Sequence, residues 1–140
     1  MLTRRTRRGQ ALVETAMVLP FMILLVMGVI DVGRLLFAHV ALQEATQEGA
    51  LYGAFHPTNS TAIKSRVKAS SGAQWVTGAT VEVCQIVSPA PGRVRVTSTY
   101  PLQLLTPVIP DVLGTGTVTL RSVITSTNFS TTDLSTAGCS

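Results

Sequence analysis

Few residues of this chain have side chains suited to catalysis or metal binding, and most of these are far from one another in the sequence. His39 and His56 are the only histidines, and neither has a carboxylate or a cysteine at the spacing of a metal site. The sequence contains no Gly-x-Ser-x-Gly, no glycine-rich phosphate loop and no His-Glu-x-x-His. We therefore expect no enzyme activity, no metal site and no cofactor. His39 is expected to be a packing or interface residue rather than a catalyst.

Glu14 differs from the other polar residues because it is a carboxylate at the head of an apolar run. Residues 15–30, which follow it, carry no charge. The helical segment from Gln10 to Ile30 would rise about 31 Å, which matches the thickness of a hydrocarbon core, about 30 Å. The run therefore predicts a membrane-spanning helix, and an ionisable side chain inside such a helix is a functional candidate.

Four arginines precede the run, all within residues 1–9: Arg4, Arg5, Arg7 and Arg8. The whole chain has a net charge of +4, whereas residues 10–140 hold seven basic and seven acidic side chains. The excess positive charge thus belongs to the first nine residues, where it favours retention of the N-terminus in the cytoplasm. A nucleic-acid-binding arm would use the same arginines, but their position directly before a span has a simpler explanation. We expect no nucleic-acid partner.

A cleaved secretory signal peptide would also begin with basic residues and an apolar run. It would need a small-x-small cleavage site beyond the run, and neither Ala38 nor Ala41 has a small residue two positions before it. The sequence beyond the run also keeps a helical pattern. We therefore expect one retained helix from Gln10 to about Phe55, ended by His56-Pro57 because a residue before proline disfavours the helical conformation.

Three features are expected to shape this helix. Pro20 removes a backbone donor and should kink or loosen the helix near Ala16. Asp31 and Arg34 share a helix face and can pair where the helix leaves the lipid. Residues 35–51 then combine an apolar face with a solvent-exposed face of glutamates and glutamines. This pattern predicts an amphipathic stalk helix on which a domain packs.

Residues 58–140 are predicted to form a small α+β domain. Asn59-Ser60-Thr61 offers a cap for a short helix predicted from Ala62 to Ser70, with Ile63 and Val67 on its inner face. Three segments alternate apolar and polar residues in the manner of half-buried strands: Thr80–Val87, Arg93–Tyr100 and Thr117–Thr125. The turn residues between the first two predict a hairpin, and a change of the apolar face at Cys84 indicates a bulge or a buried tip. Residues 101–116 are expected to be an apolar loop packed on the stalk.

Cys84 and Cys139 both follow the predicted span. If the arginines hold the N-terminus inside, both cysteines are extracytoplasmic, where disulfides persist. The pair is therefore a disulfide candidate, and two separate thiols are the alternative.

Gly9 and Glu14 together carry a resemblance to a known family. A glycine after a basic leader, with glutamate as the fifth residue after it, resembles a type IV prepilin processing site. Over residues 8–54 the chain resembles the TadE-like pilus-assembly proteins through four strings: Gly9-Gln10-Ala11-Leu12-Val13-Glu14, Val18-Leu19-Pro20, Gly33-Arg34 and Glu48-Gly49-Ala50-Leu51-Tyr52.

The resemblance implies a function in Tad-type (type IVb) pilus assembly, as a pseudopilin or minor pilin. A prepilin peptidase would cut after Gly9, so that the mature chain begins at Gln10. In pilins the fifth mature residue, here Glu14, supplies a carboxylate to the amine of a neighbouring subunit. The implied partners are the peptidase, other pilin or pseudopilin subunits, the inner-membrane assembly machinery and membrane lipid.

The resemblance also implies a pilin-like α+β fold, in which a small antiparallel sheet lies on the outer half of a long N-terminal helix. The expected parts are a leader (residues 1–9), a transmembrane and stalk helix (10–57) and an extracytoplasmic domain (58–140). The protein would sit in the cytoplasmic membrane with a single span, or be incorporated in a surface pilus. Two alternatives stay open: an uncleaved membrane anchor that presents an interaction domain, and an extracytoplasmic enzyme.

Overall fold

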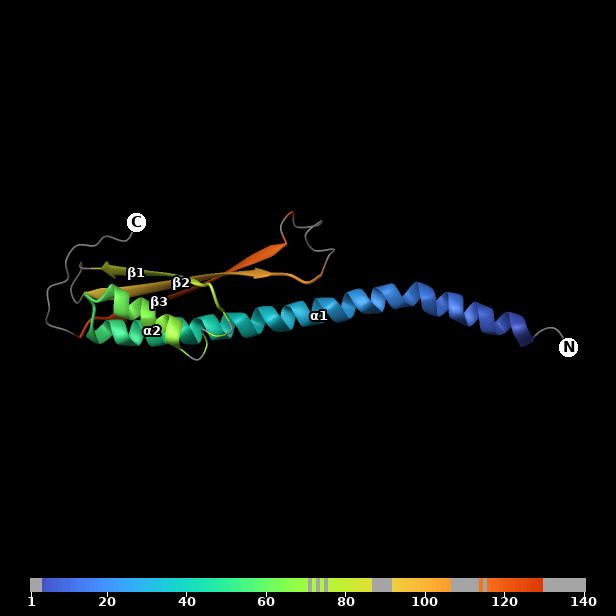
Figure 1. Cartoon of the computed structure of the whole chain (residues 1–140), viewed down its shortest axis with the longest axis horizontal. Helices are drawn as coiled ribbons and strands as arrows, with labels where there is room; N and C mark the ends of the chain where they lie inside the picture. Colours follow the sequence, from blue (N-terminus) through green and yellow to red (C-terminus); the bar gives the residue numbers. More distant parts are fainter. Residues whose placement is uncertain are drawn as a thin grey trace. The chain divides into compact units, whose positions relative to one another are not determined.

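The computed structural model describes residues 4–70, 72, 74, 76–86, 92–106, 114 and 116–129, with side chains described from Gly9 onward. Its elements are α1 (Arg4–Phe55), α2 (Ser60–Ala69), β1 (Thr80–Ile86), β2 (Arg93–Gln103) and β3 (Thr117–Thr127) (Figure 1). The chain divides into two compact units. The first contains Met1–Arg34 with Leu104–Gly116, and the second contains Leu35–Gln103 with Thr117–Ser140. The predicted α+β class, with a long apolar helix and a small antiparallel sheet, is confirmed.

The helix α1 is continuous over 52 residues. It ends at Phe55 as predicted, and its last turn is closed by the amide of His56, which donates to the carbonyl of Tyr52 at 3.1 Å. It begins at Arg4 instead of the predicted Gln10, because arginine is a good helix former and a helix that is already nucleated extends at low cost. The ribbon of α1 bends in its blue part (Figure 1), as expected of a helix that contains Pro20.

The sheet has the order β1-β2-β3, and both neighbouring pairs are antiparallel. The predicted hairpin of β1 and β2 is therefore confirmed. Their register runs without interruption from Thr80 opposite Thr99 to Ile86 opposite Arg93, so β1 contains no bulge. Residues 83–86 are half-buried on both faces of the strand, which accounts for the change of the apolar face at Cys84.

The strand β2 is longer than predicted, since it continues through Pro101 to Gln103. Proline lacks an amide donor and is disfavoured where a strand is paired on both sides. However, β1 begins at Thr80, opposite Thr99, so β2 beyond Thr99 is paired on one side only. Pro101 pairs with Thr119 of β3 at this open edge, and the predicted loop therefore begins at Leu104 instead of Pro101.

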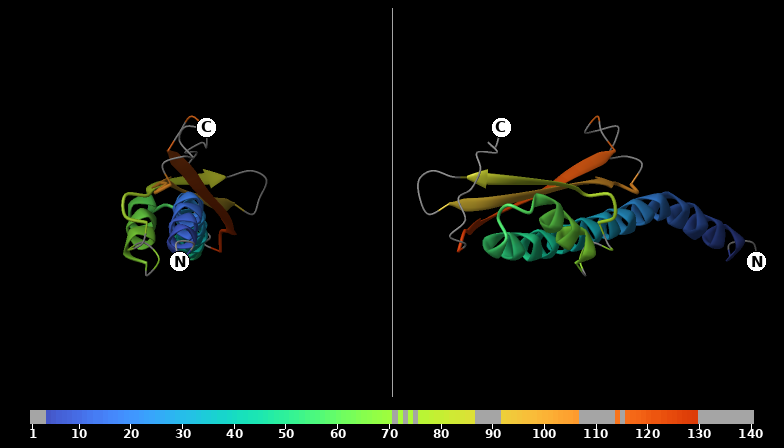
Figure 2. Two further views of the ribbon diagram at one scale, coloured as in Figure 1. Left: turned by 90° about the vertical axis from the view of Figure 1, so that its right-hand side faces the viewer. Right: turned by 60° about the vertical axis from the view of Figure 1, so that its left-hand side comes forward.

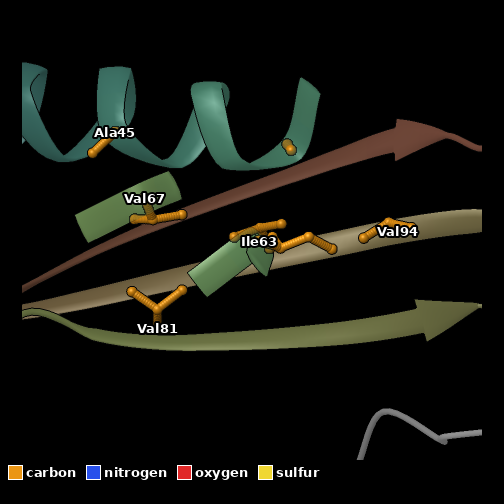
Figure 3. Close-up of a cluster of buried hydrophobic side chains, with 7 residues drawn as sticks. Ala45, Ile63, Val67, Val81 and Val94 are labelled. Carbon is orange, nitrogen blue, oxygen red and sulfur yellow. The ribbon is translucent and has the colours of Figure 1, made fainter. Parts of the chain in front are cut away.

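In the second unit, the sheet lies over the C-terminal part of α1, and α2 lies beside that part of the helix (Figure 2). The cap of α2 is Asn59, the first of the three candidate residues, because its side-chain oxygen accepts a hydrogen bond from the amide of Ala62 at 3.0 Å. The helix therefore begins at Ser60, two residues before the predicted start at Ala62. Ile63 and Val67 of α2 are buried between α1 and the sheet (Figure 3). They join a cluster that also contains Ala45, Ala50, Val81, Val94 and Val96. A second cluster is formed by Ala38, Ala41, Leu42, Val76, Leu102 and Leu120.

Small residues of α1 allow α2 and the sheet to approach closely. A Cβ atom on Gly49 would collide with the side chain of Val67. A Cβ atom on Gly53 would lie 3.1 Å from Cγ1 of Val94 and 3.2 Å from Cδ1 of Ile63. Gly49 belongs to one of the strings by which the sequence resembles the TadE-like proteins. In this fold a glycine is needed there because a side chain would prevent the close contact of α1 with α2.

Candidate membrane and assembly site

The apolar part of α1 exposes large side chains instead of packing them. Leu12, Met17 and Phe21 are 72%, 70% and 70% exposed. The helix is long and apolar enough to cross a membrane, and only 6% of its most apolar stretch is buried within the protein. The core helix of a water-soluble protein would be mostly buried, so this surface needs an apolar environment that the described residues do not supply. A single-pass membrane anchor fits this requirement.

Glu14 lies on the exposed surface of this stretch. Together with Thr15, Val18, Leu19 and Met22 it lines a shallow hollow of about 520 Å³ on α1. Within the described residues no ion pair to Glu14 is formed, and the neighbouring Thr15 hydroxyl donates to the carbonyl of Ala11 at 2.9 Å. The carboxylate is therefore presented to the surroundings from an apolar face, where a cation from another molecule could reach it.

Gly9 and Gln10 lie within α1 and are exposed. A Cβ atom on Gly9 would meet nothing within 4 Å, and the backbone there does not have a positive φ angle. Glycine inside a helix costs about 1 kcal/mol relative to alanine. Neither packing nor backbone geometry therefore explains this glycine, in contrast to Gly49.

Asp31 is a buried carboxylate that binds a distant segment of the chain, and the sequence did not predict this contact. Its side chain is 2% exposed, and its carboxylate binds the loop that follows β2. The amide of Leu105 donates to Oδ1 at 3.0 Å and to Oδ2 at 3.1 Å, and the amide of Thr106 donates to Oδ2 at 2.8 Å. The Thr106 hydroxyl also donates to Oδ2. We call these contacts the Asp31 clamp.

The predicted pair of Asp31 and Arg34 is present as well, with 3.6 Å between Nη1 and Oδ1. The hydroxyl of Thr106, then the amide of Leu105, lower the pKa of the Asp31 carboxyl, and the nearby Arg34 guanidinium acts in the same direction. The sequence signals nearest to the clamp were the charge of Asp31 at the end of an apolar run and the expectation that the apolar loop packs on the helix.

The other sequence candidates lie elsewhere. Cys84 is half-buried in β1, and Cys139 lies outside the described residues, so their disulfide stays a prediction. His39 contacts Gln43, with 3.2 Å between their Nε2 atoms, and His56 stacks on Tyr52 with ring centroids 4.6 Å apart. Among the described residues no group of three or more histidine, cysteine, aspartate or glutamate side chains could hold a metal ion.

The model of the family described as TadE-like protein matches residues 9–51. The matched segment begins at the exposed glycine, includes Glu14 and Asp31, and ends inside the part of α1 that packs against α2 and the sheet. The resemblance that the sequence strings indicated is thus confirmed over this segment. Comparison with curated proteins and with solved structures gave no match.

Proposed function

We propose that this protein is a pseudopilin or minor pilin that takes part in Tad-type pilus assembly and is processed after Gly9 by a prepilin peptidase. The observation that carries the proposal is the match of residues 9–51 to the TadE-like family, which indicates a role in pilus assembly. The exposed position of Gly9, and the lack of a packing reason for it, support its role in a processing site.

Cleavage would change the electrostatics at the start of the helix. It removes the four arginines and leaves the α-amino group of Gln10, whose pKa in model compounds is about 7.7–8.0, so that it is largely cationic at neutral pH. A lone charge next to hydrocarbon is costly, whereas a charge paired with a carboxylate is tolerated. Glu14 of a neighbouring subunit can supply that carboxylate, because it is exposed on an apolar face.

Besides the ion pair, assembly requires a surface on which helices can pack, and the exposed apolar part of α1 can supply it. Side chains such as Phe21 and Met17 have no packing partner in the described residues and face lipid before assembly. In an assembly they would pack against the helices of other pilin or pseudopilin subunits or of the inner-membrane machinery. We accordingly place the N-terminus in the cytoplasm, the apolar part of α1 (residues 10–30) in the cytoplasmic membrane and the second unit, which includes α1 from Leu35 onward, outside it.

The processing step is tested by replacing Gly9. In a strain that contains the peptidase, the membrane-extracted protein should begin at Gln10 and be lighter by about 1.1 kDa, the mass of the removed leader. Gly9→Leu should insert normally but keep the full mass. Gly28→Leu is the matched control, because a Cβ atom there also meets nothing within 4 Å. Intact mass spectrometry decides the matter, and an unshortened wild-type protein favours the uncleaved-anchor alternative.

The assembly step is tested at Glu14. Glu14→Val should insert at least as well as the wild type, because a carboxylate inside a span costs on the order of 2–3 kcal/mol at mid-span and less near the interface. It should nevertheless reduce assembly, since the amine of the neighbour loses its partner. The control is Glu82→Gln, an exposed carboxylate on β1. Normal pilus numbers in the Glu14 variant, counted by electron microscopy, would remove the basis for the proposed ion pair.

A further inference from the structure

The residues directly after β2 are fixed to α1 within the first unit. The amide of Leu104 donates to the carbonyl of Gly116 at 3.0 Å, which closes the base of the loop. The next two amides, of Leu105 and Thr106, both bind the Asp31 carboxylate. Thr106 is 5% exposed and Asp31 is 2% exposed, so the contact excludes solvent. Residues 104–106 are therefore held at one defined level of the helix.

That level is where the charge-free part of α1 ends. Asp31 is the first charged residue after residues 15–30, and a span that begins at Gln10 reaches the opposite face of a hydrocarbon core of about 30 Å at this point. The clamp satisfies the carboxylate with donors from its own chain, which lowers the cost of keeping an aspartate at a membrane boundary.

The surface around the clamp is apolar and open. Val29 and Val32 of α1 are 65% and 59% exposed, and Leu105 is 59% exposed although its amide is bound. Arg34 adds a guanidinium whose side chain is 42% exposed. Exposed apolar side chains at the level where the charge-free part of the helix ends match the boundary layer of a phospholipid surface.

We propose that residues 104–106 form a second contact with the membrane, in which Leu105 inserts into the interfacial layer of the bilayer beside α1 and the Asp31 clamp holds it there. The occupant is a phospholipid surface, because the patch continues the exposed, charge-free surface of the helix that the proposed function places in the membrane. The inference rests on the membrane anchor of the proposed function and is independent of cleavage and assembly.

The test places an environment-sensitive fluorophore on single cysteines of the full chain, in a background with Cys84→Ser and Cys139→Ser. The protein is reconstituted in phosphatidylethanolamine and phosphatidylglycerol vesicles that contain spin-labelled lipids, with the label near the headgroup to report on position 105 or deep in the acyl chain to report on position 21. A label at Leu105→Cys should shift to the blue and lose fluorescence to the spin-labelled lipid. The control Phe129→Cys, at a side chain 73% exposed in the second unit, should be quenched only by a water-soluble quencher.

A further label at Phe21→Cys separates this inference from the anchor itself. Lipid quenching at position 21 without quenching at 105 overturns the second contact and leaves the span intact, whereas no quenching at either position overturns the span. A label at 105 that is shielded from both quenchers indicates a protein neighbour and also overturns the proposal.

The role of the clamp is tested in the same vesicles. Asp31→Ala should reduce lipid quenching at 105 to the level at 129, and Thr106→Val, which removes one hydroxyl only, should reduce it in part. Quenching that persists in both variants would show that the loop reaches the lipid without the clamp.

Discussion

The two parts of α1 present their apolar residues in opposite ways. In the first unit, large side chains such as Leu12 and Phe21 face outward and are more than two-thirds exposed. In the second unit, small residues such as Ala45 and Ala50 face inward and are 1% exposed. One continuous helix therefore meets two different surroundings, of which only the second is supplied by the described part of the chain.

This contrast indicates where the stability of each unit comes from. The second unit buries two apolar clusters beneath its sheet, so the hydrophobic effect stabilises it within one molecule. The described residues of the first unit bury few apolar side chains, and the long-range hydrogen bonds among them include a set to Asp31. The exposed apolar surface of this part fits a membrane anchor. Substitutions in the part of α1 that belongs to the second unit should thus change the stability of the fold. Substitutions in the part that belongs to the first unit should change the contacts of the helix with its environment instead.

The largest effect on folding is expected at Leu42, which is 0% exposed. Leu42→Ala should lower the free energy of unfolding of the second unit by about 2–5 kcal/mol, through lost apolar burial and the cavity left behind. Leu25→Ala is the matched control in the first unit, where the side chain is 58% exposed. Denaturant unfolding in detergent micelles, followed by circular dichroism, measures both. Equal losses for the two variants would contradict the contrast.

A smaller loss is expected at Gly49. The Cβ atom of Gly49→Val would collide with Val67, and overpacking of this kind costs about 1–3 kcal/mol. Gly28→Val adds the same atoms in the first unit, where a Cβ atom meets nothing within 4 Å. The melting temperature of the second unit should fall in the first variant only. An unchanged melting temperature for Gly49→Val would mean that α2 can move away from α1 at little cost.

The features that could be predicted from the sequence are those with a local signal. The end of α1 followed from His56-Pro57, the presence of α2 from the capping residues Asn59-Ser60-Thr61, and the strands from their alternation of apolar and polar residues. The match over residues 9–51 likewise rests on a continuous string of residues. Signals of this kind act over a few positions and do not depend on the rest of the fold.

The features that were missed depend on contacts between distant segments. Pro101 is accommodated in β2 only because β1 begins opposite Thr99, and no local pattern shows where a neighbouring strand begins. The bond between Asp31 and Thr106 joins residues of a helix and a loop, and it leaves no periodic trace in the sequence. The nearest sequence signals were the charge of Asp31 at the end of an apolar run and the apolar character of the loop.

A local effect is expected at the clamp. Asp31→Asn removes the charge and one acceptor, so the amides of Leu105 and Thr106 should exchange hydrogen faster. The amide of Leu104, which binds Gly116 instead, serves as the internal control. Because the folded-state pKa of Asp31 is lowered, the clamp contributes stability above the ordinary carboxyl pKa and loses it as the pH falls through the folded-state value. Acidification should therefore reproduce the variant once each exchange rate is divided by its intrinsic rate at that pH and compared with that of Leu104. Relative exchange rates that respond to neither change would contradict the clamp.

The smallest effect is expected at Ser98, and its sign is opposite to the others. Ser98 is 0% exposed, and its hydroxyl has no hydrogen-bond partner among the described residues. A buried hydroxyl without a partner carries a desolvation cost of about 1–3 kcal/mol, so Ser98→Ala should leave stability unchanged or raise it by on the order of 1 kcal/mol after the small loss of packing.

Ser126 provides the matched control in the same unit, because its hydroxyl donates to the carbonyl of Ala50 at 2.8 Å and so joins β3 to α1. Ser126→Ala should cost about 1 kcal/mol, the usual net contribution of one hydrogen bond. The denaturation midpoint should therefore fall for Ser126→Ala and stay unchanged or rise for Ser98→Ala. If both lower it equally, the Ser98 hydroxyl is hydrogen-bonded in the folded protein, and the core beneath the sheet includes a polar contact that the apolar clusters alone do not explain.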